Sequence, residues 1–322
     1  MTVLVLCISE TTPSAILLLR DRFKGKGLWD YLDVFLVPFL SILSGLFIAL
    51  LVWYLESGAR RKEARLSIER EDSREEDRKE REHTRLEASK VQALQAFYDR
   101  VSDILINKQV ITLAESARRL GSSYVDPVVE SSRIIVRART LSILREMKND
   151  GEKKSSAIRF LVESKILSVL SVSLSGADLS LVNLLGIHLR RVDLFSANLF
   201  AANLGAADLS GSNLSLSNLQ ATVLTNANLC NAILIGSDLS RAKLYHVDLS
   251  GANLVGARLT EAKLLGAKLI AVDLRQADLS GTSLRNVNLK DIKWDDGTIW
   301  PESRKFEGAE NIPASLIVQI GL

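Results

Sequence analysis

Leucine recurs at every fifth position from Leu174 to Leu289, 24 times in succession. Neither of the two regular backbone structures has this period. In an α-helix five residues turn the chain by about 500°, so successive leucines would lie about 140° apart and scatter around the axis. In a strand neighbouring side chains alternate between the two faces, so an odd period would send successive leucines to opposite sides. The pattern therefore predicts a backbone that is neither a plain helix nor a flat strand.

The position two residues before each leucine is typically alanine, as at Ala197, Ala202 and Ala252, with other small or β-branched residues elsewhere. Residues two apart point the same way in an extended segment, so each unit can direct one small and one large apolar side chain inward. The chain must then turn a corner, which suits glycine. The recurring glycines are Gly176, Gly186, Gly211, Gly236, Gly251, Gly256, Gly266 and Gly281. A corner at every unit would close the chain into a coil around leucine.

These units resemble the pentapeptide-repeat family, whose motif is A(D/N)LxX. The sequences GADLS at 176–180, SANLF at 196–200 and GANLV at 251–255 match the motif directly. The resemblance implies a mainly β fold, a right-handed quadrilateral β-helix with four units per coil, so the 24 units would form about six coils. Stacked at about 4.8 Å, these coils would be about 29 Å long.

Asp or Asn precedes most of the leucines, and these side chains are expected to point outward. Positions that depart from the motif include Val223, Ile233, Lys243, Arg258, Lys263, Lys268 and Ser283. With four units per coil, residues 20 apart stack, so Arg258 is expected between Asp238 and Asp278. Lys268 should likewise stack on Asp248. Lys243 and Lys263 would stack with like charge. We interpret them as two solvated lysines that splay apart; the alternative is an anion site.

Residues 34–55 contain no charged side chain. As a helix these 22 residues would be about 33 Å long, enough to cross bilayer hydrocarbon of about 30 Å. Trp29 and Tyr31 precede the stretch, and Trp53 and Tyr54 end it, as expected at two membrane interfaces. The alternative is a buried core helix, which is usually shorter. We therefore predict a single transmembrane helix.

After this stretch the sequence carries alternating charges at helical spacing, such as Glu75 with Lys79 and Asp77 with Arg81. Such pairs stabilise a helix, so we predict a solvated single helix; the alternative is a disordered polyampholyte. From Val91 an amphipathic pattern predicts a further helix, which the segment 121–127 breaks. Two more helices are expected, one over about 128–147 and a shorter one around Phe160.

The predicted organisation has six parts. The helical region is expected to cover one end of the solenoid, and the residues after the last repeat are expected to cap the other. The parts are an N-terminal flank at 1–33, a transmembrane helix at 34–55, a charged juxtamembrane helix at 56–90, a helical region at 91–171, the β-helix at 172–293, and a C-terminal cap and tail at 294–322. This order resembles membrane-anchored bacterial pentapeptide-repeat proteins.

No residue stands out as catalytic, cofactor-binding or metal-ligating, so we predict no such site, no cofactor and no enzyme activity. His83 lies in the charged helix, and His188 and His246 lie on the repeat surface, with no metal-ligand spacing. The sequence contains no phosphate-binding loop, dinucleotide fingerprint or nucleophile elbow. The recurring glycines are explained by corners.

The predicted function is a membrane-tethered scaffold or protein–protein interaction module with an unknown protein partner. One alternative is a DNA-mimic regulator of a topoisomerase, a role the resemblance brings with it. Such a mimic needs an acidic surface, yet residues 174–293 hold 11 Lys and Arg against 9 Asp and Glu, so no nucleic-acid role is expected. A second alternative is an accessory to an enzyme. The row Ser41, Gly45 and Ala49 would allow two helices to pair in a homodimer.

The expected location is the bacterial inner membrane, with the repeats facing the cytoplasm. Basic residues flank both ends of the predicted span, so the positive-inside rule does not decide the orientation. The N-terminal stretch has no early positive charge, so a cleavable signal peptide is not expected. Cys7 and Cys230 lie in unrelated regions and are expected to be free thiols.

Overall fold

The computed structural model describes residues 28–107, 109–119 and 126–320. The chain divides into two compact units, one up to Thr84 and one from Arg85 onward. The expectations for Cys7 and for the basic residues on the N-terminal side of the predicted span lie outside the described part.

The first described element is helix α3, Leu28–Asn107, an uninterrupted α-helix of 80 residues. It passes through the predicted boundaries after residues 55 and 90. Gly58 lies inside the helix without stopping it, and no glycine or proline occurs between Ala59 and Asn107. Two of the predicted charge pairs form on it: Lys79 Nζ lies 3.1 Å from Glu75, and Arg81 lies 3.9 Å from Asp77. The charged segment is therefore helical.

The apolar part of α3 has the length and composition to cross a membrane. Its mean hydropathy reaches 2.0 over 18 residues, and none of that window is buried. The Trp53 and Tyr54 side chains are 64% and 70% exposed. A core helix is mostly buried, whereas this window is exposed among the described residues. The side chains of Trp29 and Tyr31 lie outside the described part.

Four shorter helices follow: α4 (Val110–Arg119), α5 (Pro127–Glu146), α6 (Gly151–Glu163) and α7 (Ile166–Val169). The predicted helix beginning at Val91 does not continue to residue 120 as expected. It ends with α3 and restarts as α4, because the backbone of Gln109 has a φ of 46°, which a right-handed helix cannot contain.

Capping residues set the starts of the next two helices. Asp126 precedes α5 and accepts the backbone N–H of Val128 at 2.7 Å, and Pro127 takes the first helical position. Asp150 precedes α6 and accepts the N–H of Lys153 at 3.1 Å. The predicted helices at 128–147 and around Phe160 are confirmed as α5 and α6.

The C-terminal part of α3 packs on α6 through both apolar and charged contacts. The rings of Tyr98 and Phe160 lie 4.8 Å apart between centroids. The Glu87 carboxylate accepts from Lys153 at 2.7 Å and from Lys90 at 2.7 Å. These contacts bind the two helices into one small bundle, although Val91, where the amphipathic pattern begins, is 58% exposed.

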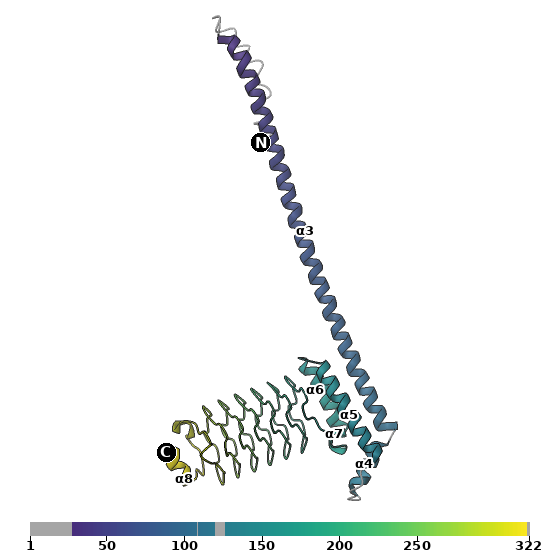
Figure 1. Ribbon diagram of the computed structural model, residues 1–322, viewed down its shortest axis with the longest axis vertical. Helices are drawn as coiled ribbons and strands as arrows, with labels where there is room; N and C mark the ends of the chain where they lie inside the picture. Colours follow the sequence, from purple (N-terminus) through teal and green to yellow (C-terminus); the bar gives the residue numbers. More distant parts are fainter. Residues whose placement is uncertain (1–27, 108, 120–125, 321–322) are drawn as a thin grey trace. The chain divides into compact units, whose positions relative to one another are not determined.

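The repeats form a β-helix that advances one coil every 20 residues, as the parallel pairing of Asp178 with Asn198 and of Asn198 with Asn218 shows (Figure 1). Each unit contributes one bridged residue and then a turn. In the first turn the N–H of Ala177 donates to the Leu174 carbonyl at 3.0 Å, and Gly176 between them has a φ of 70°. A positive φ at this third turn position is the signature of a type II turn, and it recurs at every corner.

The leucines lie inside, as predicted. All 24 are at most 1% exposed, and the small residues two positions before them are buried beside them. The leucine core is continuous with the core of the helical bundle, which includes Val101, Leu144 and Leu161, through Leu170 and Val172. In Figure 1 the bundle helices α5 to α7 lie at the first coils, and α8 (Ala314–Ile320) lies at the opposite end.

Candidate interaction surface

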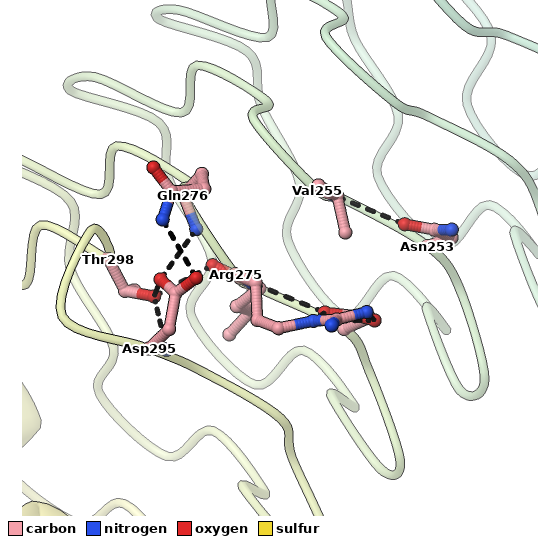
Figure 2. A network of polar contacts seen from close by, with 8 residues as sticks. Asn253, Val255, Arg275, Gln276, Asp295 and Thr298 are labelled. Carbon is pink, nitrogen blue, oxygen red and sulfur yellow. Dashed lines mark hydrogen bonds and ion pairs between the residues drawn. The ribbon is translucent and has the colours of Figure 1, made fainter.

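Where Asp or Asn precedes the leucine, its side chain stabilises the following corner from outside. Asn218 Oδ1 accepts the backbone N–H of Gln220 at 3.1 Å, and Asn253 Oδ1 accepts that of Val255 at 3.1 Å (Figure 2). The amides also link successive coils, since Asn218 Nδ2 donates to Asn198 Oδ1 at 3.2 Å. These side chains point outward as predicted, but the ladder they form was missed. The recurrence of Asp or Asn before most of the leucines could have predicted it.

Helix α6 covers the open edge of the first coil, where backbone groups have no preceding coil to bind. Ser155 Oγ accepts the N–H of Asn183 at 2.8 Å, and Arg159 donates to the carbonyl of Asn183 at 3.0 Å. Lys154, whose side chain is fully buried, donates to Asp178 at 2.8 Å. Burial alone would raise the pKa of Asp178, but the hydrogen bond from Lys154 helps to hold it below its usual value. The predicted cap at this end is thus a set of specific polar contacts.

The last coil is closed by the segment after the repeats. Asp295 accepts the backbone N–H of Gln276 at 3.0 Å, its side-chain amide at 2.8 Å, and the N–H of Gly297 at 3.1 Å (Figure 2). Hydrogen bonds from the Gln276 side chain and backbone lower the pKa of Asp295. The rings of Trp300 and Phe306 lie 6.1 Å apart beyond this turn. Because both ends are covered, the lateral faces remain as the surfaces open to a partner.

The predicted charge stacking on the lateral faces is confirmed. Arg258 lies between Asp238 and Asp278 in the pairing of the coils and donates to Asp238 at 3.3 Å. Lys268 stacks on Asp248 and donates to it at 3.4 Å. Exposed pairs of this kind contribute little to stability, but they neutralise the surface locally. These columns therefore offer no strong field of either sign.

One lateral face carries a group of exposed apolar side chains, Phe195, Leu216, Ile233 and Ile235, which we name the Ile235 patch. Their exposed fractions are 39%, 58%, 41% and 41%. Leu216 and Ile235 lie in neighbouring coils, since the N–H of Leu216 donates to the carbonyl of Ile235 at 2.9 Å. Val255 follows Ile235 in the same column, since the N–H of Gly236 donates to the Val255 carbonyl at 2.9 Å. Such a group on a rigid surface is a candidate docking site.

The described residues contain no group of three or more His, Cys, Asp or Glu that could hold a metal ion. His83, His188 and His246 are all exposed, as expected. Burial and a hydrogen bond to the Asp248 carboxylate raise the pKa of Cys230 to about 11, so this free thiol stays protonated at neutral pH. It is not an activated nucleophile.

Comparison with known proteins points to one family. The family model for pentapeptide repeats matches in eight copies, over residues 173–211, 197–234, 212–251, 222–260 and 252–291. No curated protein matches the chain.

Three solved structures illustrate the similarity. HetL of Nostoc sp. strain PCC 7120, a pentapeptide repeat protein involved in the regulation of heterocyst differentiation, is 29% identical over 43% of this chain and 73% of its own, with a TM-score of 0.22. Rfr23 of Cyanothece 51142 is 31% identical over 37% of this chain and 90% of its own, with a TM-score of 0.20. QnrB1, a plasmid-mediated fluoroquinolone resistance protein, is 21% identical over 46% of this chain and 84% of its own, with a TM-score of 0.19.

Proposed function

The chain belongs to the pentapeptide-repeat family, and we propose that it is a membrane-tethered scaffold that binds a protein partner through its repeat domain and carries out no reaction. The Ile235 patch is the observation that supports this most. Large apolar side chains that are grouped on a water-exposed surface gain free energy when a second surface covers them. Backbone hydrogen bonds hold the corner at Ile235, since the N–H of Ser237 donates to the Leu234 carbonyl at 3.1 Å, so little entropy would be lost on docking.

We infer that the apolar part of α3 is the tether, at residues 34–55, and that the charged helix at 56–90 separates it from the bundle at 91–171. The β-helix at 172–293 would then present about six coils to the partner, with the cap at 294–322 closing the far end. Location in a bacterial inner membrane with the repeats in the cytoplasm fits the free thiol at Cys230. Protease added to intact spheroplasts tests this orientation: digestion of the repeats before permeabilisation would reverse it.

The DNA-mimic alternative is disfavoured by charge. Between residues 174 and 293 the cations outnumber the acids by 11 to 9, and several acids are paired with cations. Such a surface does not reproduce the dense negative charge of a DNA backbone. An accessory role beside an enzyme remains compatible with a docking surface, and the identity of the captured partner would separate it from a pure scaffold.

Site-specific photocrosslinking in membranes tests the proposal. A photoreactive residue placed at Ile235 in the full chain should capture a discrete protein partner, whereas one placed at Ser250, on another face, should not. Leu216→Ser, a neighbouring change within the patch, should reduce the capture at position 235 at least several-fold. Equal capture from both positions, or capture insensitive to Leu216→Ser, would contradict docking on the Ile235 patch.

A further inference from the structure

A small hollow lies near the C-terminal end of the solenoid, on a face other than that of the Ile235 patch. Its volume is about 300 Å³, at the lower end of the range for ligand sites. It forms where two neighbouring positions of the repeat lack a bulky side chain. Ser283 stands where the motif has Asp or Asn, and Gly281 at the corner has no side chain at all. The neighbouring coils carry longer side chains, so the surface is recessed at this point.

Two lysines border the hollow along one column of the solenoid. Lys263 pairs with Ser283, and Lys305 takes the corresponding place in the last turn, because Leu284 donates to its carbonyl at 2.9 Å as Leu244 does to that of Lys263. This column also contains Lys243, which pairs with Lys263. Neither Lys263 nor Lys305 has an ion-pair partner among the described residues.

This column differs from the other charged columns in having no acid. Lys268 elsewhere stacks on Asp248, and Arg258 stacks on Asp238, so those cations are neutralised at contact distance. Positions 183, 203, 223, 243, 263 and 283 hold only neutral or cationic side chains. The like charges of neighbouring lysines therefore repel each other until an anion neutralises them.

The remaining lining residues fit an anion. Arg285 adds a third cation, although it also contacts Glu307 at 2.9 Å. Glu261 is the acid in the lining, and its carboxylate is bound by Arg241 at 2.9 Å. Tyr245 supplies a hydroxyl beside an apolar ring. The formal charge of the lining is therefore positive even with Glu261 counted.

We propose that this hollow, bordered by Lys263, Ser283, Arg285 and Lys305, is a binding site for a phosphate group. A phosphate offers three strongly accepting oxygens and up to two negative charges, which matches several cationic and hydroxyl donors better than one carboxylate does. The volume admits a phosphate with a small organic body, which would lie against Tyr245. The group could belong to a soluble phosphate ester or to a lipid headgroup, and both present the same oxygens. This inference does not depend on the Ile235 patch.

Titration of the full chain with inorganic pyrophosphate tests the site. In a non-ionic detergent that contains no phosphate, isothermal titration calorimetry should show saturable binding that equal ionic strength of sodium chloride does not abolish. The double variant Lys263→Gln/Lys305→Gln should weaken the affinity at least ten-fold. Both substitutions lie on the surface and leave the leucine core intact, and circular dichroism would verify the fold.

The matched control is Lys148→Gln/Lys290→Gln, which removes the same charge from exposed positions outside the hollow. This control should leave the affinity within two-fold of the original chain. Absence of saturable binding would overturn the proposal. An equal loss of pyrophosphate affinity in both double variants would also overturn it, because net charge alone would then explain the binding.

A second arm identifies the source of the phosphate. The same titration is repeated with the chain in nanodiscs that contain an anionic phospholipid. If lipid headgroups occupy the hollow, the apparent affinity for pyrophosphate falls in the discs, and the fall disappears in Lys263→Gln/Lys305→Gln. If the affinity is the same in discs and detergent, the site takes a soluble phosphate. Either result supports the site, whereas a fall that persists in the double variant counts against it.

Discussion

At the scale of single residues, the repeat is maintained by an inner and an outer requirement. The inner one is the leucine at every fifth position, which excludes nearly any other side chain. The outer one is the Asp or Asn that accepts the N–H two residues later and joins the amide ladder, as Asn203 does with Gly205 and Asn183. Where the outer residue is replaced, the coil still forms, because the core is unaffected, but the corner loses these bonds.

Val223 follows Asn203 in its column and interrupts the ladder there. We expect Val223→Asn to raise the free energy of unfolding by about 1 kcal/mol, since it adds one bond to its own corner and one to Asn203. Val223→Asp restores only the acceptor and should gain less. Urea unfolding of the full chain in detergent measures both, and an equal gain in the two variants would show that the ladder contributes nothing.

The inward and outward assignment is tested by two adjacent positions. Leu224 is fully buried, so Leu224→Asp places an unpaired charge among leucines and should cost several kcal/mol or prevent folding. Thr225→Asp, one residue further on, points outward and should change the melting temperature little. Thermal unfolding of both variants followed by circular dichroism tests this. A similar loss of melting temperature at the two positions would contradict the assignment.

At the scale of elements, the repeat domain depends on how its first coil is covered. The coil leaves backbone donors and acceptors at its edge, and α6 binds them through Ser155 and Arg159 rather than through a further strand. Polar side chains of a helix can satisfy such an edge only if the helix lies very close. The contact at Gly151, the first residue of α6, shows how close it lies.

A Cβ at Gly151 would lie 2.1 Å from the carbonyl oxygen of Leu181. Gly151→Ala must therefore push α6 away from the first coil, and we expect a loss of about 1–3 kcal/mol. Hydrogen exchange at the amide of Asn183 should accelerate at the same time, because its acceptor Ser155 moves away. Ser156→Ala, on the exposed side of α6, is the control and should change neither quantity. Unaltered exchange at Asn183 would mean that α6 does not cap this edge.

At the scale of the whole molecule, two properties follow from features spread over the chain. One is the resistance of the repeats to acid, which depends on many outward carboxylates. The other is membrane association, which depends on one helix alone. The two can be tested separately, because the carboxylates belong to the unit that begins at Arg85 and the apolar helix to the unit before it.

Several outward carboxylates have a pKa below the usual value. For Asp238 and Asp248 burial acts in the opposite direction, and hydrogen bonds from neighbouring serines outweigh it. A depressed folded pKa means that stability is present above the unfolded pKa, near 4, and is lost as pH falls below it. The melting temperature should therefore be level near neutral pH and decline below about pH 4–5. Asp238→Asn/Asp248→Asn should flatten that decline, and a parallel curve would contradict the role of these groups.

The membrane prediction concerns the apolar part of α3. The full chain should remain in the membrane pellet after washes with alkaline carbonate and with high salt, because a spanning helix is held by hydrocarbon rather than by charge. Replacement of Leu46 and Leu50, which are exposed on α3, by Arg should release it. Release of the unchanged chain by either wash would show that the helix does not span.

The solenoid was predictable from the sequence because its information is local. Each five-residue unit specifies its own turn and its own inward leucine, so the fold repeats without reference to distant residues, and the positive φ at Gly176 is repeated at Ala201 and Glu261. The span and the charged helix are local in the same sense. The stacking of Asp238 and Asp248 on basic residues could be predicted once the coil length of 20 residues was known.

Other features depend on contacts between segments that do not belong to the same repeat, and only the tertiary structure shows them. The capping of the first coil by Lys154 and Ser155 joins a helix to residues more than 20 positions away, and no pattern in the sequence marks it. Lys305 borders the hollow beside Lys263 because the last turn departs from the 20-residue spacing: Asp278 pairs with Ile299 and Asn288 with Glu310. That irregular spacing places Lys305 beside the column of Ser283, since the N–H of Leu284 donates to its carbonyl. The repeated sequence specifies each coil locally, whereas the two ends of the solenoid are determined by the segments that pack against them.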